Sequence, residues 1–294
     1  MKKISRKKKR EEKPESNGEK IKAKKSLGQH FLTSQSALKQ IVEVGNVTSG
    51  DIVVEIGPGN GVLTEALVGK AGKVIAIEKD NQLAGMLKEK FSRAIQGFSL
   101  ELIAGDVLDF DPTTIKQSRK AVTYKVIANI PYYITNAIIR LFLEAEAQPE
   151  QMVLLIQKEV AERIIARDGK ESILSIAVKA YGTPKIVAKV PAGAFNPPPK
   201  VDSAILSIEG ISKKLFHSNS PTEAKVFEKA FFKIVRAGFA HKRKKLAGNL
   251  TSLYKKEAII AAFTKTKLSP DTRAEDITLK DWKKLTEELL LTVK

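Results

Sequence analysis

The sequence predicts an α/β fold, in which a seven-stranded sheet with intervening helices is followed by a small helical domain. Two observations support this prediction. Seven short apolar runs alternate with helix-like stretches up to residue 210, and beyond that point the pattern is helical. The early runs are continuous and β-branched, which is typical of strands buried on both faces of a parallel sheet. In order, the runs are Ile52–Ile56, Val74–Ile77, Leu100–Ile103, Val126–Ile127, Met152–Ile156, Ile186–Val190 and Ala204–Ile208.

The helices that can be placed best have recognisable starts. An amphipathic stretch over Ser34–Val44 precedes the first apolar run. After residue 210, Ser220 can cap a helix, Pro221 suits its first position and Glu223 can complete a capping box. Further helices are expected over Glu257–Phe263 and from Thr278. The first helix of this second domain carries an apolar stripe made of Val226, Ala230, Phe231, Ile234 and Val235, and the last contains Trp282, Leu285 and Leu289.

Charge divides the chain into three parts. Residues 1–22 are rich in Lys, Glu and Ser and predict a basic disordered tail. Residues 1–25 carry 12 basic and 4 acidic groups, residues 26–210 carry 20 of each, and residues 211–294 carry 19 and 9. The whole excess of +18 therefore lies in the two ends. Cationic surfaces attract polyanions, so nucleic acid is the first candidate partner; alternatively, the lysines only keep the protein soluble. We expect domains at 23–210 and 211–294.

The composition excludes several classes of function. The chain has no Cys and three scattered His, which excludes a disulfide scaffold and a thiolate centre and leaves no metal site to expect. No apolar run is long enough to span a membrane, and the basic N-terminus lacks the apolar region of a secretory signal. We therefore expect a cytoplasmic protein without a membrane partner, and a monomer.

A glycine-rich turn follows the first apolar run. The segment Glu55–Gly61 reads E-x-G-x-G-x-G and leads into a helix, where a ligand can approach the backbone closely. Val62 stands where a dinucleotide fingerprint would have glycine. Glu78 ends the second run and can accept hydrogen bonds from ribose hydroxyls, while Asp106 follows the third run and can contact an adenine amine. The combination resembles the S-adenosyl-L-methionine site of Rossmann-like class I methyltransferases; the alternative is a tight turn without a ligand.

A second motif, Asn129-Ile130-Pro131-Tyr132, ends the fourth run. An exocyclic adenine amine is a poor nucleophile because its lone pair is delocalised into the ring. The Asn129 amide oxygen and the Ile130 carbonyl can accept its two N–H groups and favour a more reactive nitrogen. Pro131 fixes the backbone direction, and Tyr132 offers a face on which a base can stack. The alternative is an ordinary strand-end turn with a core tyrosine.

These and other motifs resemble the rRNA adenine dimethyltransferases, in family order from Lys25 to the C-terminus. The resemblance is strongest to the bacterial type that acts on 16S rRNA. It implies N6,N6-dimethylation of two adjacent adenosines in a hairpin near the 3′ end of 16S rRNA during small-subunit maturation. The additional motifs are Lys25–Leu32, Gln157–Arg163, Phe195–Ala204, Phe239–Leu246 (as a basic helix segment) and Arg273–Glu275.

The resemblance also implies roles for single residues. His30 and Leu32 would line the cofactor entrance, although many members carry Asn in place of His30. Phe195 would pack on the far side of the target base from Tyr132. The residues implied for cofactor binding are His30, Leu32, Gly57, Gly59, Glu78, Asp106 and Asn129; those for catalysis are Asn129, Ile130, Pro131, Tyr132 and Phe195; and those for RNA binding are Lys242, Arg243, Lys244 and Lys245.

Three other functions remain open at this point. A resistance-type 23S rRNA adenine methyltransferase would share both loops, although the Pro-Pro-Pro-Lys-Val-Asp-Ser-Ala segment and the late Arg-Ala-Glu favour the 16S type. A non-catalytic nucleic-acid-binding relative would not need intact loops. A nicotinamide oxidoreductase is disfavoured by Val62 and by the Asn129–Tyr132 loop.

Overall fold

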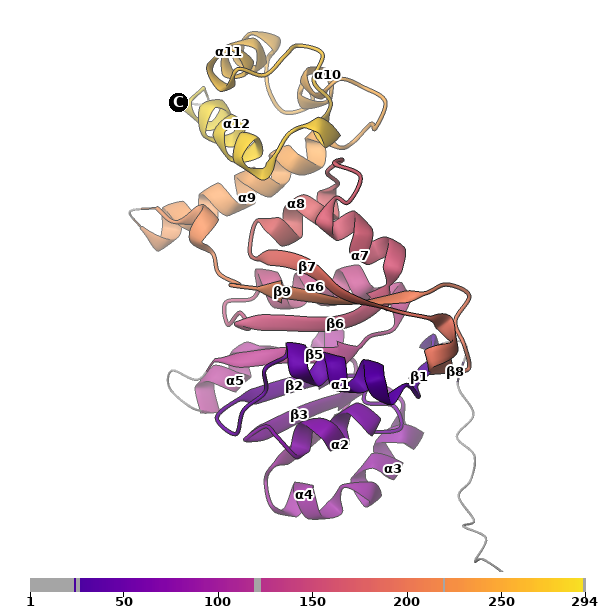
Figure 1. The fold of residues 1–294 in the computed structure, drawn as a ribbon. Helices are drawn as coiled ribbons and strands as arrows, with labels where there is room; N and C mark the ends of the chain where they lie inside the picture. The colour runs from indigo at the N-terminus through magenta and orange to yellow at the C-terminus, as the bar shows by residue number, and fades with distance from the viewer. Residues whose placement is uncertain (1–23, 25–26, 119–122, 219, 293–294) are drawn as a thin grey trace, which may run out of the picture.

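The computed structural model describes residues 24, 27–118, 123–218 and 220–292, and its core is a mixed seven-stranded sheet (Figure 1). All seven apolar runs form strands of this sheet, so that prediction is confirmed. The predicted tail over residues 1–22 lies outside the described part. The strands are β2 (Ile52–Ile56), β3 (Lys73–Glu78), β4 (Leu100–Ala104), β5 (Tyr124–Asn129), β6 (Gln151–Gln157), β7 (Thr183–Val190) and β9 (Ser203–Glu209).

The strand order is β4-β3-β2-β5-β6-β9-β7. The first five strands are parallel, and β9 pairs antiparallel with both β6 and β7. The chain builds outward from β2 to β4 and then returns to place β5 on the other side of β2. This reversal creates a switch point at the carboxyl ends of β2 and β5, where open α/β sheets bind their ligands. The glycine-rich turn and Asn129 both lie at this point.

Helices cover both faces of the sheet. Alternate strand residues point to opposite faces, so Val53 packs with the first helices, whereas Val54 belongs to the core on the other face. The helices before β5 are α1 (Gln35–Val44), α2 (Val62–Val68), α3 (Asn81–Lys90), α4 (Ser92–Gln96) and α5 (Thr113–Ser118); those after it are α6 (Thr135–Glu144), α7 (Lys158–Ile165) and α8 (Ile173–Lys179). The predicted amphipathic stretch forms α1, and the Ser34 side chain caps this helix by accepting from the Ala37 N–H.

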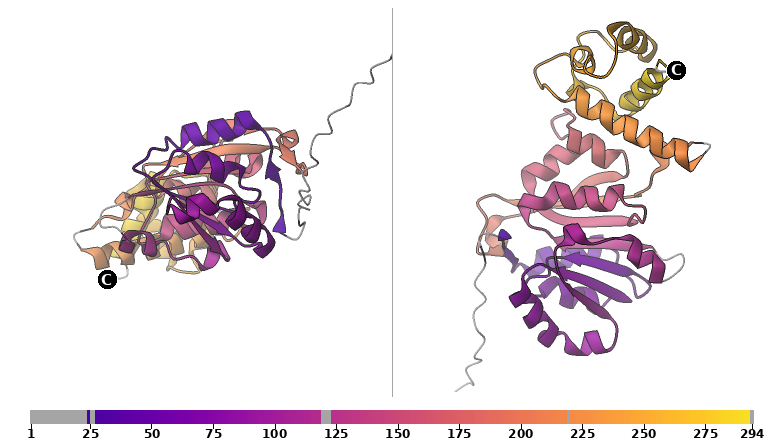
Figure 2. Two further views of the ribbon diagram at one scale, coloured as in Figure 1. Left: turned by 90° about the horizontal axis from the view of Figure 1, so that it is seen from below. Right: turned by 180° about the vertical axis from the view of Figure 1, so that it is seen from behind.

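A two-stranded sheet anchors the N-terminal end of the described chain. Strand β1 (Phe31–Leu32) pairs antiparallel with β8 (Phe195–Asn196). This pairing lies beside the carboxyl end of the main sheet, near the hairpin that leads into β9 (Figures 1 and 2). It therefore carries residues 27–32 past the switch point.

The C-terminal region, expected as a second domain, is helical and lies at one end of the molecule, with α9 as its helix nearest the sheet (Figures 1 and 2). Its helices are α9 (Pro221–Gly238), α10 (Leu246–Leu250), α11 (Lys256–Thr266) and α12 (Leu279–Leu291). Gly238 lets α9 and α12 approach, because a Cβ there would lie 2.3 Å from the Trp282 ring. Trp282 is fully buried and is continuous with the core on the α6–α8 face of the sheet.

Three local expectations for this domain are wrong. Ser220 caps α9 by accepting from the Glu223 N–H, but the reciprocal bond of a capping box does not form. The Glu223 carboxylate accepts from the Ser218 hydroxyl and not from the Ser220 backbone. Val226 is 59% exposed and leaves the apolar stripe. Residues His241–Lys245 form a turn between α9 and α10, not a helix. The turn forms because the Gly238 and His241 carbonyls accept from the buried Asn249 amide, and that geometry stops α9 from continuing.

Among the described residues, no helix is both long and apolar enough to cross a membrane.

Candidate functional site: a pocket at the sheet edge

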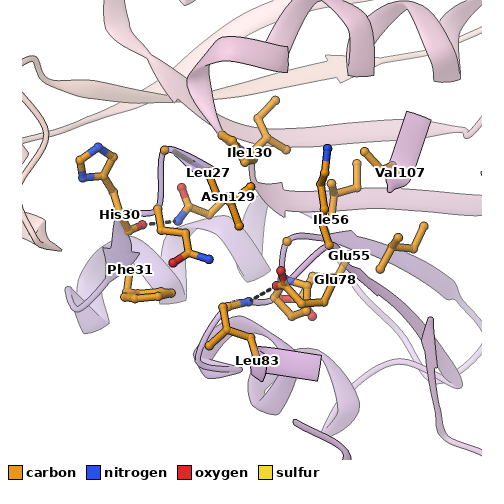
Figure 3. A pocket seen from close by; sticks show the side chains of 18 of the residues that line it. Leu27, His30, Phe31, Glu55, Ile56, Glu78, Leu83, Val107, Asn129 and Ile130 are labelled. Atoms are coloured by element: carbon orange, nitrogen blue, oxygen red, sulfur yellow. Dashed lines mark hydrogen bonds between the residues drawn. The ribbon is translucent and has the colours of Figure 1, made fainter. Parts of the chain in front are cut away.

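One pocket opens at the switch point, and it has a volume of about 980 Å³ including its mouth (Figure 3). Its walls come from segments far apart in the sequence, which is the arrangement expected where parallel strands end side by side. Most of the predicted site residues line it together. The lining segments are Leu27–Leu32, Glu55–Asn60, Ile77–Lys79, Gly105–Val107 and Asn129–Ile134, with Val62, Leu63 and Leu83.

The glycine-rich turn follows β2 and leads into α2. Gly57, Gly59 and Gly61 all have positive φ, at 64°, 61° and 79°. A Cβ at Gly59 would lie 3.0 Å from the Phe31 ring, and one at Gly61 would lie 2.7 Å from Phe91. Backbone conformation and close packing thus require glycine at both of these positions. The turn presents bare backbone to the pocket, which suits a ligand that must come close.

Glu78 ends β3 beneath this turn and is 5% exposed. Its carboxylate accepts hydrogen bonds from the Gly59 N–H at 3.0 Å and from the Asp80 N–H at 2.9 Å. Figure 3 shows Glu78 in the pocket wall. Burial raises the pKa of Glu78, against the lowering effect of these two donors. Glu78 therefore holds the glycine turn in place while its remaining lone pairs face the pocket.

Glu55 is a second buried carboxyl in the pocket wall, with 1% of its surface exposed. Within the described part of the chain, neither of its carboxyl oxygens has a hydrogen-bond partner. Burial raises the pKa of Glu55 to about 8, the Glu78 charge adds to this rise, and Thr64 opposes it. At neutral pH the Glu55 carboxyl is mostly protonated, so it can donate as well as accept a hydrogen bond.

Asp106 lies at the carboxyl end of β4, where the sequence predicts an adenine contact, and it lines the pocket. Both of its carboxylate oxygens already have partners: the Leu108 N–H at 3.0 Å and the Lys79 ammonium at 2.6 Å. These two donors hold the pKa of Asp106 below its ordinary value. An adenine amine would have to share the carboxylate with Lys79, a residue that the sequence argument does not identify.

Asn129 ends β5 with its side chain turned toward the N-terminal segment (Figure 3). Its amide nitrogen donates to the His30 carbonyl at 3.0 Å. This bond fixes the rotation of the amide, so the oxygen is left as an acceptor. Among the residues that the structure describes, no hydrogen bond uses that oxygen. The geometry agrees with the role that the sequence predicts for Asn129, and β1 supplies the orientation.

Tyr132 is half-buried in the loop after Asn129. Its hydroxyl hydrogen-bonds to the Ser203 hydroxyl at 2.6 Å, and burial raises its pKa, so the ring remains neutral. The ring that stacks with it is His30, with centroids 5.9 Å apart and planes inclined by 24°. The Nδ1 atom of His30 lies 2.8 Å from the Pro197 carbonyl.

The structure places Phe195, which is expected on the far side of the target base from Tyr132, in the protein core. It is 3% exposed, pairs with Leu32 through β8 and belongs to the core on the α1–α3 face. It is not part of the pocket lining. His30, expected at the cofactor entrance, lines the pocket, and its ring faces Tyr132. Sequence spacing could not reveal this arrangement, because Pro197 positions His30 from 167 residues away.

The pocket suits S-adenosyl-L-methionine on the chemistry of its groups. That cofactor carries a nucleoside and a positively charged sulfonium but no phosphate. The pocket offers the unpartnered Glu55 carboxyl, the Glu78 carboxylate and the bare glycine turn, together with apolar walls from Val107 and Ile130. The Glu78 carboxylate favours a cationic ligand, and the protonated Glu55 carboxyl can donate or accept a hydrogen bond.

The predicted RNA-binding residues lie on the turn between α9 and α10, and all four are exposed. Lys242 and Lys244 line a cleft between the two domains, which also includes Arg163 and Asn136, next to the Tyr132 loop. Lys245 instead forms an ion pair with Asp271. The cleft thus lies between the basic turn and the start of α6, the helix that follows the Tyr132 loop.

The fold and the pocket define a class I type of methyltransferase, and comparisons with known proteins narrow the class. The family model described as "Ribosomal RNA adenine dimethylase" matches residues 20–290. The "Ribosomal RNA small subunit methyltransferase A" of Dehalococcoides mccartyi is 42% identical over 267 residues, which cover 90% of this chain and 88% of the relative. The chain therefore belongs to the ribosomal RNA adenine dimethylase family.

Two solved structures of related methyltransferases share the fold of this chain. A dimethyladenosine transferase from Plasmodium falciparum is 26% identical with a TM-score of 0.70, covering 87% of this chain and 96% of that one. The 23S rRNA methyltransferase ErmE is also 26% identical, with a TM-score of 0.68, covering 88% and 99%. Because proteins named for different rRNAs share the architecture, the fold alone does not select the RNA.

Proposed function

We propose that this protein transfers methyl groups from S-adenosyl-L-methionine to N6 of two adjacent adenosines in a hairpin near the 3′ end of 16S rRNA, forming N6,N6-dimethyladenosine. The single observation that carries the chemistry is the Asn129 amide, which the His30 carbonyl orients at the mouth of the nucleoside pocket beside Tyr132. The choice of RNA rests on the small-subunit names of the relatives that cover most of the chain.

The residues at the end of β5 act mainly by positioning. When bound, the cofactor supplies an electrophilic methyl group. Asn129 Oδ1 and the Ile130 carbonyl accept the two N–H groups of the adenine amine, which directs its lone pair toward that methyl group. Tyr132 holds the base by stacking. The nitrogen would gain the methyl group as the bond from that carbon to the sulfonium sulfur breaks, which leaves a neutral thioether, and the nitrogen would release a proton to solvent. One N–H then remains, so the same acceptors can hold the amine for a second transfer.

The helical domain supplies the attraction for RNA. The sheet domain is electrically neutral overall, whereas residues 211–294 carry an excess of +10. Lys242, Arg243 and Lys244 are exposed beside the interdomain cleft, where they can reach phosphates that flank a base bound at Tyr132. We place the reaction on the immature small subunit in the cytoplasm, with the enzyme acting as a monomer.

The test is incubation with labelled S-adenosyl-L-methionine and small subunits that lack the modification, followed by mapping of the methylated nucleotides by mass spectrometry. We expect two adjacent dimethyladenosines near the 3′ end of 16S rRNA, and no product with Asn129→Ala. Large subunits serve as the parallel substrate. Label in 23S rRNA alone would contradict the proposed substrate and favour the alternative suggested by the similarity to ErmE.

A further inference from the structure

A buried aspartate just outside the nucleoside pocket connects two of its walls. Asp80 follows Glu78 by two residues, is 4% exposed, and is not part of the pocket lining. Its backbone N–H donates to Glu78 at 2.9 Å. Its side chain accepts from the Gln82 N–H at 3.0 Å and so caps α3. A helix cap explains this last contact but not the rest of the carboxylate's partners.

Two of those partners come from the N-terminal end of the described chain. The Lys24 ammonium lies 2.8 Å from Asp80 Oδ1, and Gln29 Nε2 donates to Oδ2 at 3.2 Å. Gln29 is itself oriented by the Lys24 N–H, which donates to its amide oxygen at 2.7 Å. Burial pushes the pKa of Asp80 upward, but the hydrogen bonds from Lys24 and Gln29 outweigh it and hold that pKa below its ordinary value. The carboxylate is thus charged and fully engaged.

The segment held in this way forms one wall of the pocket. Residues Leu27–Leu32 line the pocket, and we call them the roof segment. Phe31 packs on the Gly59 turn, and the His30 carbonyl accepts from Asn129. The far end of the roof segment is fixed by β1–β8 pairing and by the Thr33 N–H, which donates to the Ala194 carbonyl at 2.8 Å. At the near end, Asp80 receives both of the side-chain hydrogen bonds described above.

We propose that Asp80 is a positioning residue, which joins the roof segment to the Glu78 wall and thereby fixes the pocket at the distance that S-adenosyl-L-methionine requires. This inference rests on the cofactor in the proposed function. Through its side chain, Asp80 holds Gln29 and the roof segment; through its backbone, it holds the Glu78 carboxylate. Loss of the side-chain connection leaves the roof segment free to move. The cofactor must then order this segment when it binds, so its affinity falls.

The experiment separates this connection from helix capping. Lys24→Met with Gln29→Leu removes the two side-chain contacts that Asp80 receives from the N-terminal end of the described chain. The Asp80 cap on α3 stays intact. Lys39→Met is the matched control, because the Lys39 side chain is 76% exposed and, among the described residues, pairs only with Glu43 on its own helix. Lys24→Arg keeps the cation and should restore binding. Asp80→Asn is compared with Asp111→Asn, since Asp111 caps the start of α5 through the Thr113 N–H away from the pocket.

Two measurements are made on the full chain. Calorimetry should show cofactor affinity about tenfold weaker in the double variant and in Asp80→Asn, as expected for lost charge-assisted hydrogen bonds, with both controls unchanged. Hydrogen exchange without cofactor should show faster exchange within the roof segment in the double variant, while its thermal unfolding midpoint stays within about a degree of that of the unchanged chain.

Unchanged affinity and unchanged exchange in the double variant would overturn the inference. So would an Asp80→Asn variant that loses only thermal stability, because that is the behaviour of a simple cap. Cofactor binding by the unchanged chain separates failure of this inference from failure of the proposed function. If the unchanged chain does not bind S-adenosyl-L-methionine, the cofactor in the proposed function is wrong, and the role of Asp80 toward that cofactor is wrong with it.

Discussion

The nucleoside pocket and the basic turn place their charges in opposite ways. In the pocket, the carboxyls of Glu55 and Glu78 are buried, and the Glu78 carboxylate is held by backbone donors. In the turn, the cations are exposed, and a buried neutral side chain, Asn249, holds the backbone beneath them. The fixed, buried groups of the pocket suit a small ligand of fixed shape. The exposed charges of the turn can move and suit a long polyanion. Each of the following predictions tests one side of this comparison.

The largest effect is expected from Asn129→Ala. This change removes the acceptor for the target amine but leaves the glycine turn and Glu78 intact. Methyl transfer should fall by about a hundredfold or more, while cofactor affinity changes by only a few-fold. Single-turnover assays and calorimetry on the same preparation check this. Equal losses of affinity and rate would show that Asn129 mainly holds the roof segment.

Glu78→Ala should weaken cofactor binding about tenfold or more. It removes a charge-assisted acceptor and also frees the Gly59 N–H, so the glycine turn loses its support. Calorimetry measures the affinity. Small-subunit binding without cofactor should be unchanged, since Glu78 lies in the pocket and not on the basic turn. Cofactor affinity equal to that of the unchanged chain would remove Glu78 from the site.

Arg243→Ala with Lys244→Ala tests the other region. Cofactor affinity should remain the same, whereas affinity for small subunits should fall several-fold at moderate salt. If both side chains contact phosphate, the slope of log affinity against log salt should become shallower by about one to two units. Lys245→Ala is the control: Lys245 pairs with Asp271, so we expect a smaller change of slope. Identical slopes in all three proteins would contradict an RNA contact at this turn.

Glu55→Gln tests the buried proton of the pocket through the pH dependence of stability. Folding raises the pKa of Glu55 from its usual range to about 8. The folded state therefore holds a proton that the unfolded state releases, and this contribution to stability is lost as pH rises from about 5 to 8. The Gln variant should lack that loss and exceed the unchanged chain at pH 8 by a few kcal/mol at most. Denaturant titrations at pH 5 and 8 measure it, and parallel pH profiles would contradict the buried proton.

The contrast also explains which parts of the fold were predictable. The seven strands were readable because continuous β-branched runs report burial on both faces, a local property. The cap at Ser220 was predictable for the same reason, because its partner lies three residues away. The basic turn was misread as a helix because the decisive contact, from Asn249 to Gly238, spans 11 residues and has no local pattern.

The sequence by itself determined the α/β class, the glycine turn, the acids at two strand ends and the Asn129–Tyr132 loop, because each is a run of residues whose chemistry can be read in place. Only the tertiary structure decided which groups meet across the pocket. In the structure, His30 stacks on Tyr132 and Phe195 is buried in the core. Asp106 pairs with Lys79, and Asp80 accepts hydrogen bonds from Lys24 and from Gln29 of the roof segment. The physical reason is distance along the chain: Lys24 and Asp80 are 56 residues apart, and Asn129 and His30 are 99. Such pairs form only when the parallel strands bring their carboxyl ends to one edge of the sheet.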